Sequence, residues 1–119
     1  MNTRPFWVLA SNNPGELAQF YAALVSKQAI NRGSTWVLTL TEAGELVFYR
    51  PSQTRPQPAQ PGRLALCLEI GQLEMAIDRA IALGGQRLEA IRQESFGREA
   101  WMADPEGNRL LLLELNQNR

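Results

Sequence analysis

The chain has 119 residues, a length that suits one compact domain and is short for two ordinary ones. Its 12 basic and 12 acidic residues cancel, so there is no positive surface charge to hold nucleic acid or an anionic membrane. It contains no histidine, which excludes a histidine general base, a Ser-His-Asp triad, a Cys-His pair and histidine-ligated metal sites. With 45% apolar residues, the chain is expected to fold.

Cysteine usage and the length of apolar runs indicate the compartment. The single cysteine, Cys67, has no partner for an intramolecular disulfide, and the first residues lack the apolar stretch of a signal peptide. The longest apolar run, residues 20–25, is far below the roughly 18 residues that a membrane helix needs. We therefore expect a cytoplasmic protein that does not associate with a membrane.

The first half of the chain, about residues 5–50, predicts the element order β-α-β-β-β. Residues 6–10 form an apolar run of strand length. Asn13 and Pro14 then predict a helix start, because asparagine caps free amide groups and proline lacks an amide that the first turn leaves unbonded. The expected buried stripe of this helix is Leu17, Phe20, Tyr21, Leu24 and Val25. Strand patterns follow at 28–31, 36–40 and 45–49, with turns at 32–34 and 43–44.

Residues 51–62 carry four prolines, which neither extend a helix nor donate to a sheet. This segment is expected to be a semi-extended linker, and a proline-rich ligand for a partner domain is the alternative. The second half, about residues 63–115, repeats the order β-α-β-β-β. Its expected strands are 64–70, 87–92, 99–103 and 110–115, and its helix stripe is Leu73, Ala76, Ile77, Ala80 and Ile81, ended by Gly84 and Gly85. Residues 104–108, Asp-Pro-Glu-Gly-Asn, predict a turn between the last two strands.

The two halves align at an offset of 59 residues, which places one helix stripe over the other. Three further features matter: the first helix contains Leu17-Ala18-Gln19-Phe20-Tyr21, the second ends in Leu83-Gly84-Gly85, and the Asp-Pro-Glu-Gly-Asn turn precedes a leucine strand. In these features and in its repeated element order, the chain resembles the vicinal oxygen chelate superfamily. This is the group of glyoxalase I, bleomycin-resistance proteins and extradiol dioxygenases. The resemblance covers about residues 6–115. It implies an α+β fold, with two tandem β-α-β-β-β modules forming a cupped mixed sheet, and usually a homodimer.

The resemblance also implies where a metal ion would be held. In the superfamily's metal enzymes four side chains point into the cup, and three of the corresponding positions here are Phe6, Ala65 and Leu111. The fourth falls somewhere in residues 45–48, where only Glu45 offers a ligand oxygen. Because a divalent ion needs several convergent nitrogen, oxygen or sulfur ligands, the superfamily's metal-dependent chemistry is disfavoured and no cofactor is expected.

Alternation of side chains along strands predicts the lining of the cup. The expected ligand-binding residues are Phe6, Val8, Trp36, Cys67, Glu69, Glu99, Trp101 and Leu111, and Leu38 shares the face of Trp36. The residues expected under the helices are Trp7, Leu9, Leu64, Leu66, Leu68, Ile70, Leu110 and Leu112. An apolar and aromatic lining suits a small apolar or aromatic molecule, although the aromatic residues could instead pack as a second core or in a dimer interface.

Several polar residues have two readings each. Cys67, between two leucines, is expected to be an inert buried thiol. Glu69 would be a general acid or base inside an apolar cup, and a solvated charge at its rim. Arg50, Arg98 and Arg109 stand at strand ends, where they could bind an anion as a bidentate fork or simply keep the surface soluble.

Three functions remain open on this reading. The leading one is metal-free binding of a small apolar or aromatic molecule without chemistry. The second is a lyase, isomerase or dioxygenase relative that uses Glu45, Glu69 or Glu99 in a non-standard metal or acid-base site. The third is a non-catalytic interaction module with a filled cup, whose sheet edges bind a partner.

Overall fold

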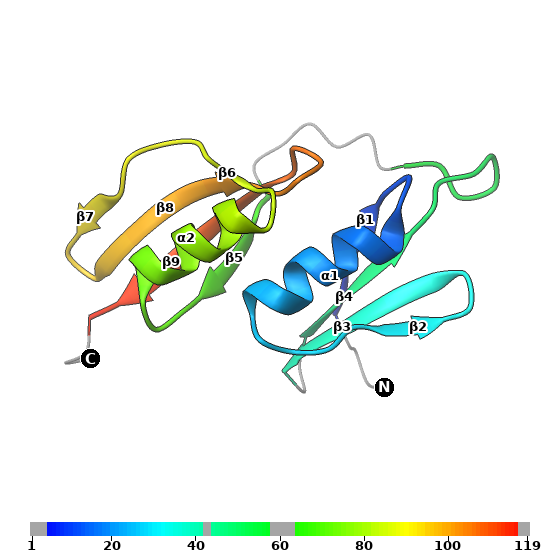
Figure 1. Ribbon diagram of the computed structural model, residues 1–119, viewed down its shortest axis with the longest axis horizontal. Coiled ribbons are helices and arrows are strands. Elements are labelled where there is room, and N and C mark those ends of the chain that lie inside the picture. Colours follow the sequence, from blue (N-terminus) through cyan, green and yellow to red (C-terminus); the bar gives the residue numbers. More distant parts are fainter. Residues whose placement is uncertain (1–4, 42–43, 58–63, 117–119) are drawn as a thin grey trace. The chain divides into compact units, whose positions relative to one another are not determined.

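The computed structural model of the protein describes residues 5–41, 44–57 and 64–116. The chain divides into two compact units, Met1–Pro61 and Gly62–Arg119, which we call unit 1 and unit 2. Each unit contains one mixed sheet and one helix that lies across a face of that sheet (Figure 1). The fold is therefore α+β, as the sequence predicts.

Unit 1 has the order β1 (Trp7–Ala10), α1 (Pro14–Leu24), β2 (Ile30–Arg32), β3 (Thr35–Thr41) and β4 (Gly44–Tyr49). The strands lie in the order β1-β4-β3-β2, with β1 parallel to β4 and the other neighbours antiparallel. This confirms the first β-α-β-β-β prediction. The predicted break at 43–44 falls partly on residue 43, which lies outside the described residues.

Helix α1 begins where the sequence predicts. The Asn13 side chain accepts a hydrogen bond from the Glu16 amide at 3.4 Å, and Pro14 is the first helical residue. The helix packs on β3 and β4, and the Tyr21 ring lies 5.8 Å from the Phe48 ring. The buried core of unit 1 comprises Leu17, Phe20, Tyr21 and Leu24 from the helix and Leu38, Leu46 and Phe48 from the sheet. The predicted helix stripe is thus the core, with Val25 only half-buried at its end.

The start of the proline-rich segment folds back onto β4. The Tyr49 hydroxyl donates to the Pro56 carbonyl at 2.9 Å, and the Arg55 guanidinium lies 4.5 Å from the Tyr49 ring centroid. These contacts bury Tyr49, although its side chain points to the sheet face opposite Phe48 and α1. Residues 58–62 of the predicted linker lie outside the described residues.

Unit 2 has the order β5 (Leu66–Glu69), α2 (Leu73–Ala82), β6 (Gln86–Arg87), β7 (Arg92–Glu94), β8 (Gly97–Ala103) and β9 (Arg109–Leu115). The strands lie in the order β5-β9-β8-β6, β7 also pairs with β8, and β5 is parallel to β9. Here the prediction of one strand at 87–92 is wrong. Arg87 pairs with Met102 and Arg92 with Glu99. Four residues lie between these two on one side and only two on β8, so the chain loops out between β6 and β7.

The internal repeat of the sequence is present in the fold. Strands β1 and β5 begin at Trp7 and Leu66, and helices α1 and α2 begin at Pro14 and Leu73, so both pairs are 59 residues apart. The predicted turn joins β8 to β9, where the Gly107 amide donates to the Asp104 carbonyl at 2.9 Å. Gly107 has a φ of +89°, a value that favours glycine.

The core of unit 2 lies between α2 and one face of its sheet. The buried residues are Leu73, Ile77 and Ala80 from the helix and Leu68, Ala100, Met102, Leu110 and Leu112 from the strands. Three residues expected in the cores are instead exposed: Trp7, Leu64 and Ile81. Among the described strands of unit 1, that of Trp7 is at the edge and pairs only with β4. Leu64 precedes β5, and Ile81 lies on the flank of α2.

Candidate ligand-binding face

The sheet of unit 2 has one face that points away from α2. Strand register defines it, because paired residues project to the same side, and Leu68, Ala100 and Leu112 occupy the side packed on α2. We call the opposite side the distal face. Its side chains include Cys67, Glu69, Arg92, Glu94, Glu99, Trp101, Arg109, Leu111 and Leu113. Five of the predicted ligand-binding residues, Cys67, Glu69, Glu99, Trp101 and Leu111, therefore share one surface.

The first row across the distal face is apolar. Cys67, Leu111 and Trp101 are direct neighbours on β5, β9 and β8. Leu111 and Trp101 are half-buried, and Cys67 is exposed. Leu113, in the next row, is also half-buried. An apolar surface that contains an indole is thus accessible on this side of the sheet.

The second row is charged at three of its four positions. Glu69, Leu113, Glu99 and Arg92 are neighbours across β5, β9, β8 and β7. Arg92 Nη2 donates to Glu99 Oε1, and Arg92 Nε lies 3.8 Å from Glu94 Oε2. The Glu99 side chain is only 9% exposed, whereas the Arg92 side chain is 50% exposed. Glu69, which ends β5, is exposed, in keeping with the alternative that it is a solvated charge and not a general acid or base.

Glu99 retains an oxygen that can accept a hydrogen bond. Within the described ranges, Arg92 is the group that hydrogen-bonds to this carboxylate, and it does so at Oε1. In the same part of the chain, every fully buried side-chain nitrogen or oxygen has a partner, so Glu99 Oε2 reaches the surface. Since a carboxylate has about four acceptor positions, most of the capacity of Glu99 is unused.

Cys67 is exposed, which corrects the expectation of a buried thiol. Among the described strands of unit 2, β5 is at the edge of the sheet and pairs on one side only, with β9. Partial desolvation, then the negative charges of Glu99 and Glu69, raise the pKa of Cys67 above its usual value of 9.0. The thiol therefore stays protonated at neutral pH and is a poor nucleophile. Both carboxylates therefore contribute a negative potential at the Cys67 end of the apolar row.

The predicted site residues of unit 1 are placed differently. Trp36 pairs with Phe48, and Leu38 with Leu46, on the side of the sheet that carries α1. A Cβ at Gly15 would lie 3.2 Å from the Trp36 indole, so this ring packs against the start of α1. The facing predicted for Trp36 and Leu38 is thus wrong, because the register sets them into the core side. Val8 does point away from α1, beside Val47, and Phe6 precedes β1.

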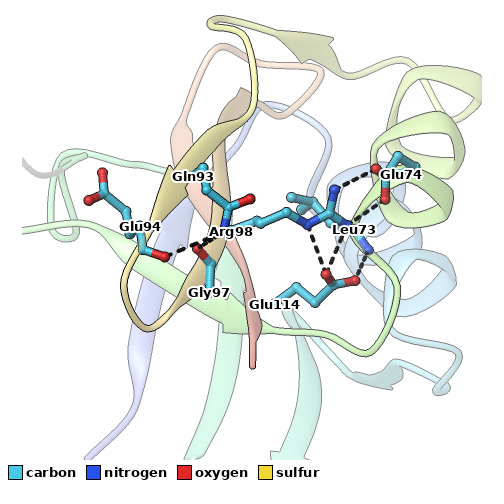
Figure 2. A network of polar contacts seen from close by, with 7 residues as sticks. All are labelled: Leu73, Glu74, Gln93, Glu94, Gly97, Arg98 and Glu114. Atoms are coloured by element: carbon cyan, nitrogen blue, oxygen red, sulfur yellow. Dashed lines mark hydrogen bonds and ion pairs between the residues drawn. The ribbon is translucent and has the colours of Figure 1, made fainter. Parts of the chain in front are cut away.

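Arg98 does not serve as a free anion-binding fork. Its Nη1 and Nη2 donate to the two Glu74 oxygens at 2.6 and 2.7 Å, and its Nε and Nη2 donate to Glu114 Oε1 at 3.0 and 2.8 Å (Figure 2). Both partners lie on the α2 side of the sheet. Arg98 holds the pKa of Glu74 at about 2, well below its ordinary 4.5. Arg50 and Arg109 are exposed, as solubilising arginines would be.

Arg92 is a candidate site residue that the sequence analysis does not predict. The sequence pattern predicts that Arg92 ends a strand and does not link it to Glu99. The pairing of Arg92 with Glu99 could have been predicted from a hairpin with the two-residue loop Ser95-Phe96. A hairpin that turns at this loop sets Arg92 opposite Glu99.

The side chains do not fit the metal centre of the superfamily's enzymes. Phe6, Ala65 and Leu111, at three of the four implied positions, have no ligand atom to offer. In residues 5–41, 44–57 and 64–116, no three His, Cys, Asp or Glu side chains gather closely enough to hold a metal ion. No helix within these ranges is both long and apolar enough to cross a membrane.

Two tandem units, each with a mixed sheet and one helix, define a protein of the vicinal oxygen chelate fold; the order is β-α-β-β-β in unit 1, and in unit 2 the strand after the helix is divided into β6 and β7. The family described as "Glyoxalase-like domain" matches residues 7–113. The chain belongs to this family, and through it to the vicinal oxygen chelate superfamily. No curated protein matches the sequence.

Solved structures with the same fold span nearly the whole chain. A glyoxalase/bleomycin resistance protein from Albidiferax ferrireducens T118 is 21% identical with a TM-score of 0.75, over 93% of this chain and 97% of its own. A glyoxalase/bleomycin resistance protein/dioxygenase family enzyme from Burkholderia phytofirmans PsJN is 17% identical with a TM-score of 0.74, over 93% and 97%. A glyoxalase-related enzyme from Fulvimarina pelagi is 17% identical with a TM-score of 0.76, over 96% and 88%. At these identities the likeness concerns the fold.

Proposed function

We propose that the protein binds a small apolar or aromatic molecule on the distal face of unit 2, without a metal ion. The observation that carries the proposal is the row Cys67, Leu111 and Trp101, which presents accessible apolar surface beside a partly used carboxylate. Binding sites for small molecules combine mainly apolar and aromatic lining with a few polar groups that set orientation. Solved structures named for bleomycin resistance share this fold, which supports a binding role at the level of architecture.

The apolar row by itself accounts for weak affinity. A ring that buries about 150 Å² gains about 4 kcal/mol at roughly 25 cal/mol per Å², which corresponds to a Kd on the order of 1 mM. Trp101 supplies a flat ring for stacking, and Leu111 and Leu113 extend the surface beside it. Tighter binding requires polar contacts, for which Glu99 and Arg92 are the adjacent groups.

Chemical-shift mapping tests the proposal directly. The ¹⁵N-labelled protein is titrated with neutral aromatic compounds such as 2-naphthylmethanol and indole, with EDTA present. We expect the shifts to centre on the Trp101 indole N–H and the β8 and β9 amides. Trp101→Ala and Leu111→Gln should each weaken binding by about fivefold or more. Met75→Gln, an apolar-to-polar change on the exposed side of α2, is the matched control and should leave the Kd unchanged.

Two results would count against the proposal. One is the lack of any saturable shift with a broad panel of aromatic compounds. The other is a set of shifts centred away from β8 and β9 that Trp101→Ala does not alter. A third result, binding that is observed only when EDTA is omitted, would contradict the proposed independence of a metal ion.

A further inference from the structure

The free oxygen of Glu99 lies in an unusual setting for a surface carboxylate. The side chain is 9% exposed, is flanked in its own row by Leu113, and adjoins the row that contains Trp101. Burial of an ionised group is costly unless its hydrogen-bonding capacity is used. A ligand that donates a hydrogen bond to Oε2 would use that capacity, whereas a purely apolar ligand would cover the oxygen and leave it unpaired.

The charges around Glu99 favour a positive ligand over a negative one. Glu69, Glu94 and Glu99 contribute three carboxylates to the second and neighbouring rows, against one guanidinium, that of Arg92. Arg109, the other arginine of the distal face, stands at the start of β9, on the far side of the Trp101 row. The pKa of Cys67 is raised first by partial desolvation and then by Glu99 and Glu69, and the part due to the carboxylates is consistent with a negative potential at this end of the apolar row. An anion bound beside Glu99 would meet this repulsion.

We propose that the ligand of the distal face is an aromatic ammonium ion, whose ring stacks on Trp101 and whose N–H donates to Glu99 Oε2. This inference rests on the proposed function and names the class of ligand. The indole strengthens the preference, because a cation beside an aromatic ring is attracted to its face. Glu99 is then the residue that selects for charge, and Trp101 and Leu111 are the residues that hold the ring.

Arg92 reduces the preference of the site for a cationic ligand. Its Nη2 bond holds Glu99 Oε1, and its positive charge offsets part of the attraction for a cationic ligand. Replacement of Arg92 by glutamine leaves a neutral hydrogen-bond donor and removes that opposing charge. The variant should therefore prefer the ammonium ion more strongly, which is the opposite of the change expected at Glu99.

Three probes with one ring and different charges separate these effects: 2-naphthylmethylammonium, 2-naphthylmethanol and 2-naphthoate. In the wild-type protein at low salt, we expect the ammonium ion to bind about tenfold more tightly than the alcohol, and the carboxylate most weakly. Glu99→Gln should reduce the tenfold preference to about twofold or less, and Arg92→Gln should increase it. Asp78→Asn, the same loss of charge on exposed α2, should leave the preference unchanged. Raising the salt concentration should weaken ammonium binding and leave alcohol binding intact.

The outcomes distinguish this inference from the proposed function. Equal binding of the three probes at Trp101 would overturn the ammonium assignment and leave the apolar site standing. A preference for 2-naphthoate would also overturn it. Failure of all three probes to bind would overturn both the proposed apolar binding site and the assignment of its ligand as an aromatic ammonium ion. Should Glu99→Gln fail to fold, the upward shift expected in Arg92→Gln still tests the assignment, and no shift there overturns it.

Discussion

Glu114, on the last strand, caps helix α2 by accepting a hydrogen bond from the Leu73 amide at 2.9 Å, across 41 residues of sequence. Gln72, at the N-cap position, makes no side-chain cap of its own. The other Glu114 oxygen is held by Arg98, which also bonds to Glu74 in the first turn of the helix (Figure 2). The start of α2 is therefore tied to the sheet by a carboxylate that no local sequence motif provides.

Loss of this cap should destabilise the protein. Glu114→Ala leaves the Leu73 amide without its acceptor and removes one of the two carboxylates from Arg98. We expect the free energy of unfolding to fall by about 1–2 kcal/mol, as measured by urea denaturation. Glu89→Ala, in the exposed loop before β7, is the control and should change stability by less than about 0.5 kcal/mol. Equal effects of the two substitutions would contradict the capping role.

Stability should decrease in acid because of the same cluster. Arg98 holds the pKa of Glu74 at about 2, and the Leu73 amide and Arg98 lower the pKa of Glu114. Both carboxyls have an ordinary pKa of 4.5, so the unfolded chain binds more protons than the folded one below that pH. The stabilisation is fully present above pH 4.5 and is lost as the pH falls toward 2.

Urea midpoints measured from pH 6 to pH 2 check this prediction. Glu74→Gln and Arg98→Met should each show a shallower loss of stability below pH 4.5 than the wild-type protein. If Glu74→Gln loses stability as steeply as the wild type over that range, the cluster is not its source.

Gly97 should tolerate no side chain. A Cβ at this position would lie 2.1 Å from the Glu114 carbonyl oxygen and 2.9 Å from the Leu115 Cα, both in the paired strand β9. Gly97→Ala should therefore cost more than about 3 kcal/mol, because backbone on both sides would have to move. Gly71→Ala is the matched control, since a Cβ there meets no described atom within 4 Å. Thermal and urea denaturation of the two variants measure the difference, and similar midpoints would show that the strands can separate locally.

The turn between β8 and β9 should depend on Asp104. Its buried carboxylate accepts hydrogen bonds from the Glu106 amide, the Asn108 amide and the Asn108 side chain at 2.8, 3.0 and 2.7 Å. Asp104→Ala should lower stability by about 1–3 kcal/mol and speed hydrogen exchange at the Asn108 amide. Asp78→Ala, on the exposed side of α2, serves as the control. Unchanged exchange at Asn108 would show that the backbone alone maintains the turn.

Cys67 should react slowly for an exposed thiol. Partial desolvation, Glu99 and Glu69 raise its pKa above 9.0, so less thiolate is present at any given pH than in a free peptide. The rate of alkylation by iodoacetamide, measured against pH, should show a midpoint above 9.0, and Glu69→Gln should lower that midpoint. A wild-type midpoint at or below 9.0 would contradict a negative potential over the apolar row.

Local chemistry explains which parts of the fold could be predicted. The cap at Asn13, the turn at Asp104 and the glycine after α2 each act within a few residues, so their side chains carry the signal in the sequence itself. The same is true of the helix stripe around Tyr21, which needs only helical periodicity to be recognised. The grouping of Cys67, Glu99, Trp101 and Leu111 on one face followed from alternation along three strands.

The sequence by itself thus determined the order of the elements apart from the division into β6 and β7, the helix starts and turns, and the apolar character of the candidate face, because neighbours along the chain control these. The tertiary structure alone decided that Trp36 faces the helix, that Arg98 is committed to Glu74 and Glu114, and that Arg92 meets Glu99. These outcomes depend on strand register, and a shift of one residue turns every side chain of a strand to the other face. Register is set by the packing of whole strands against each other and against a helix, which no single segment of the sequence encodes.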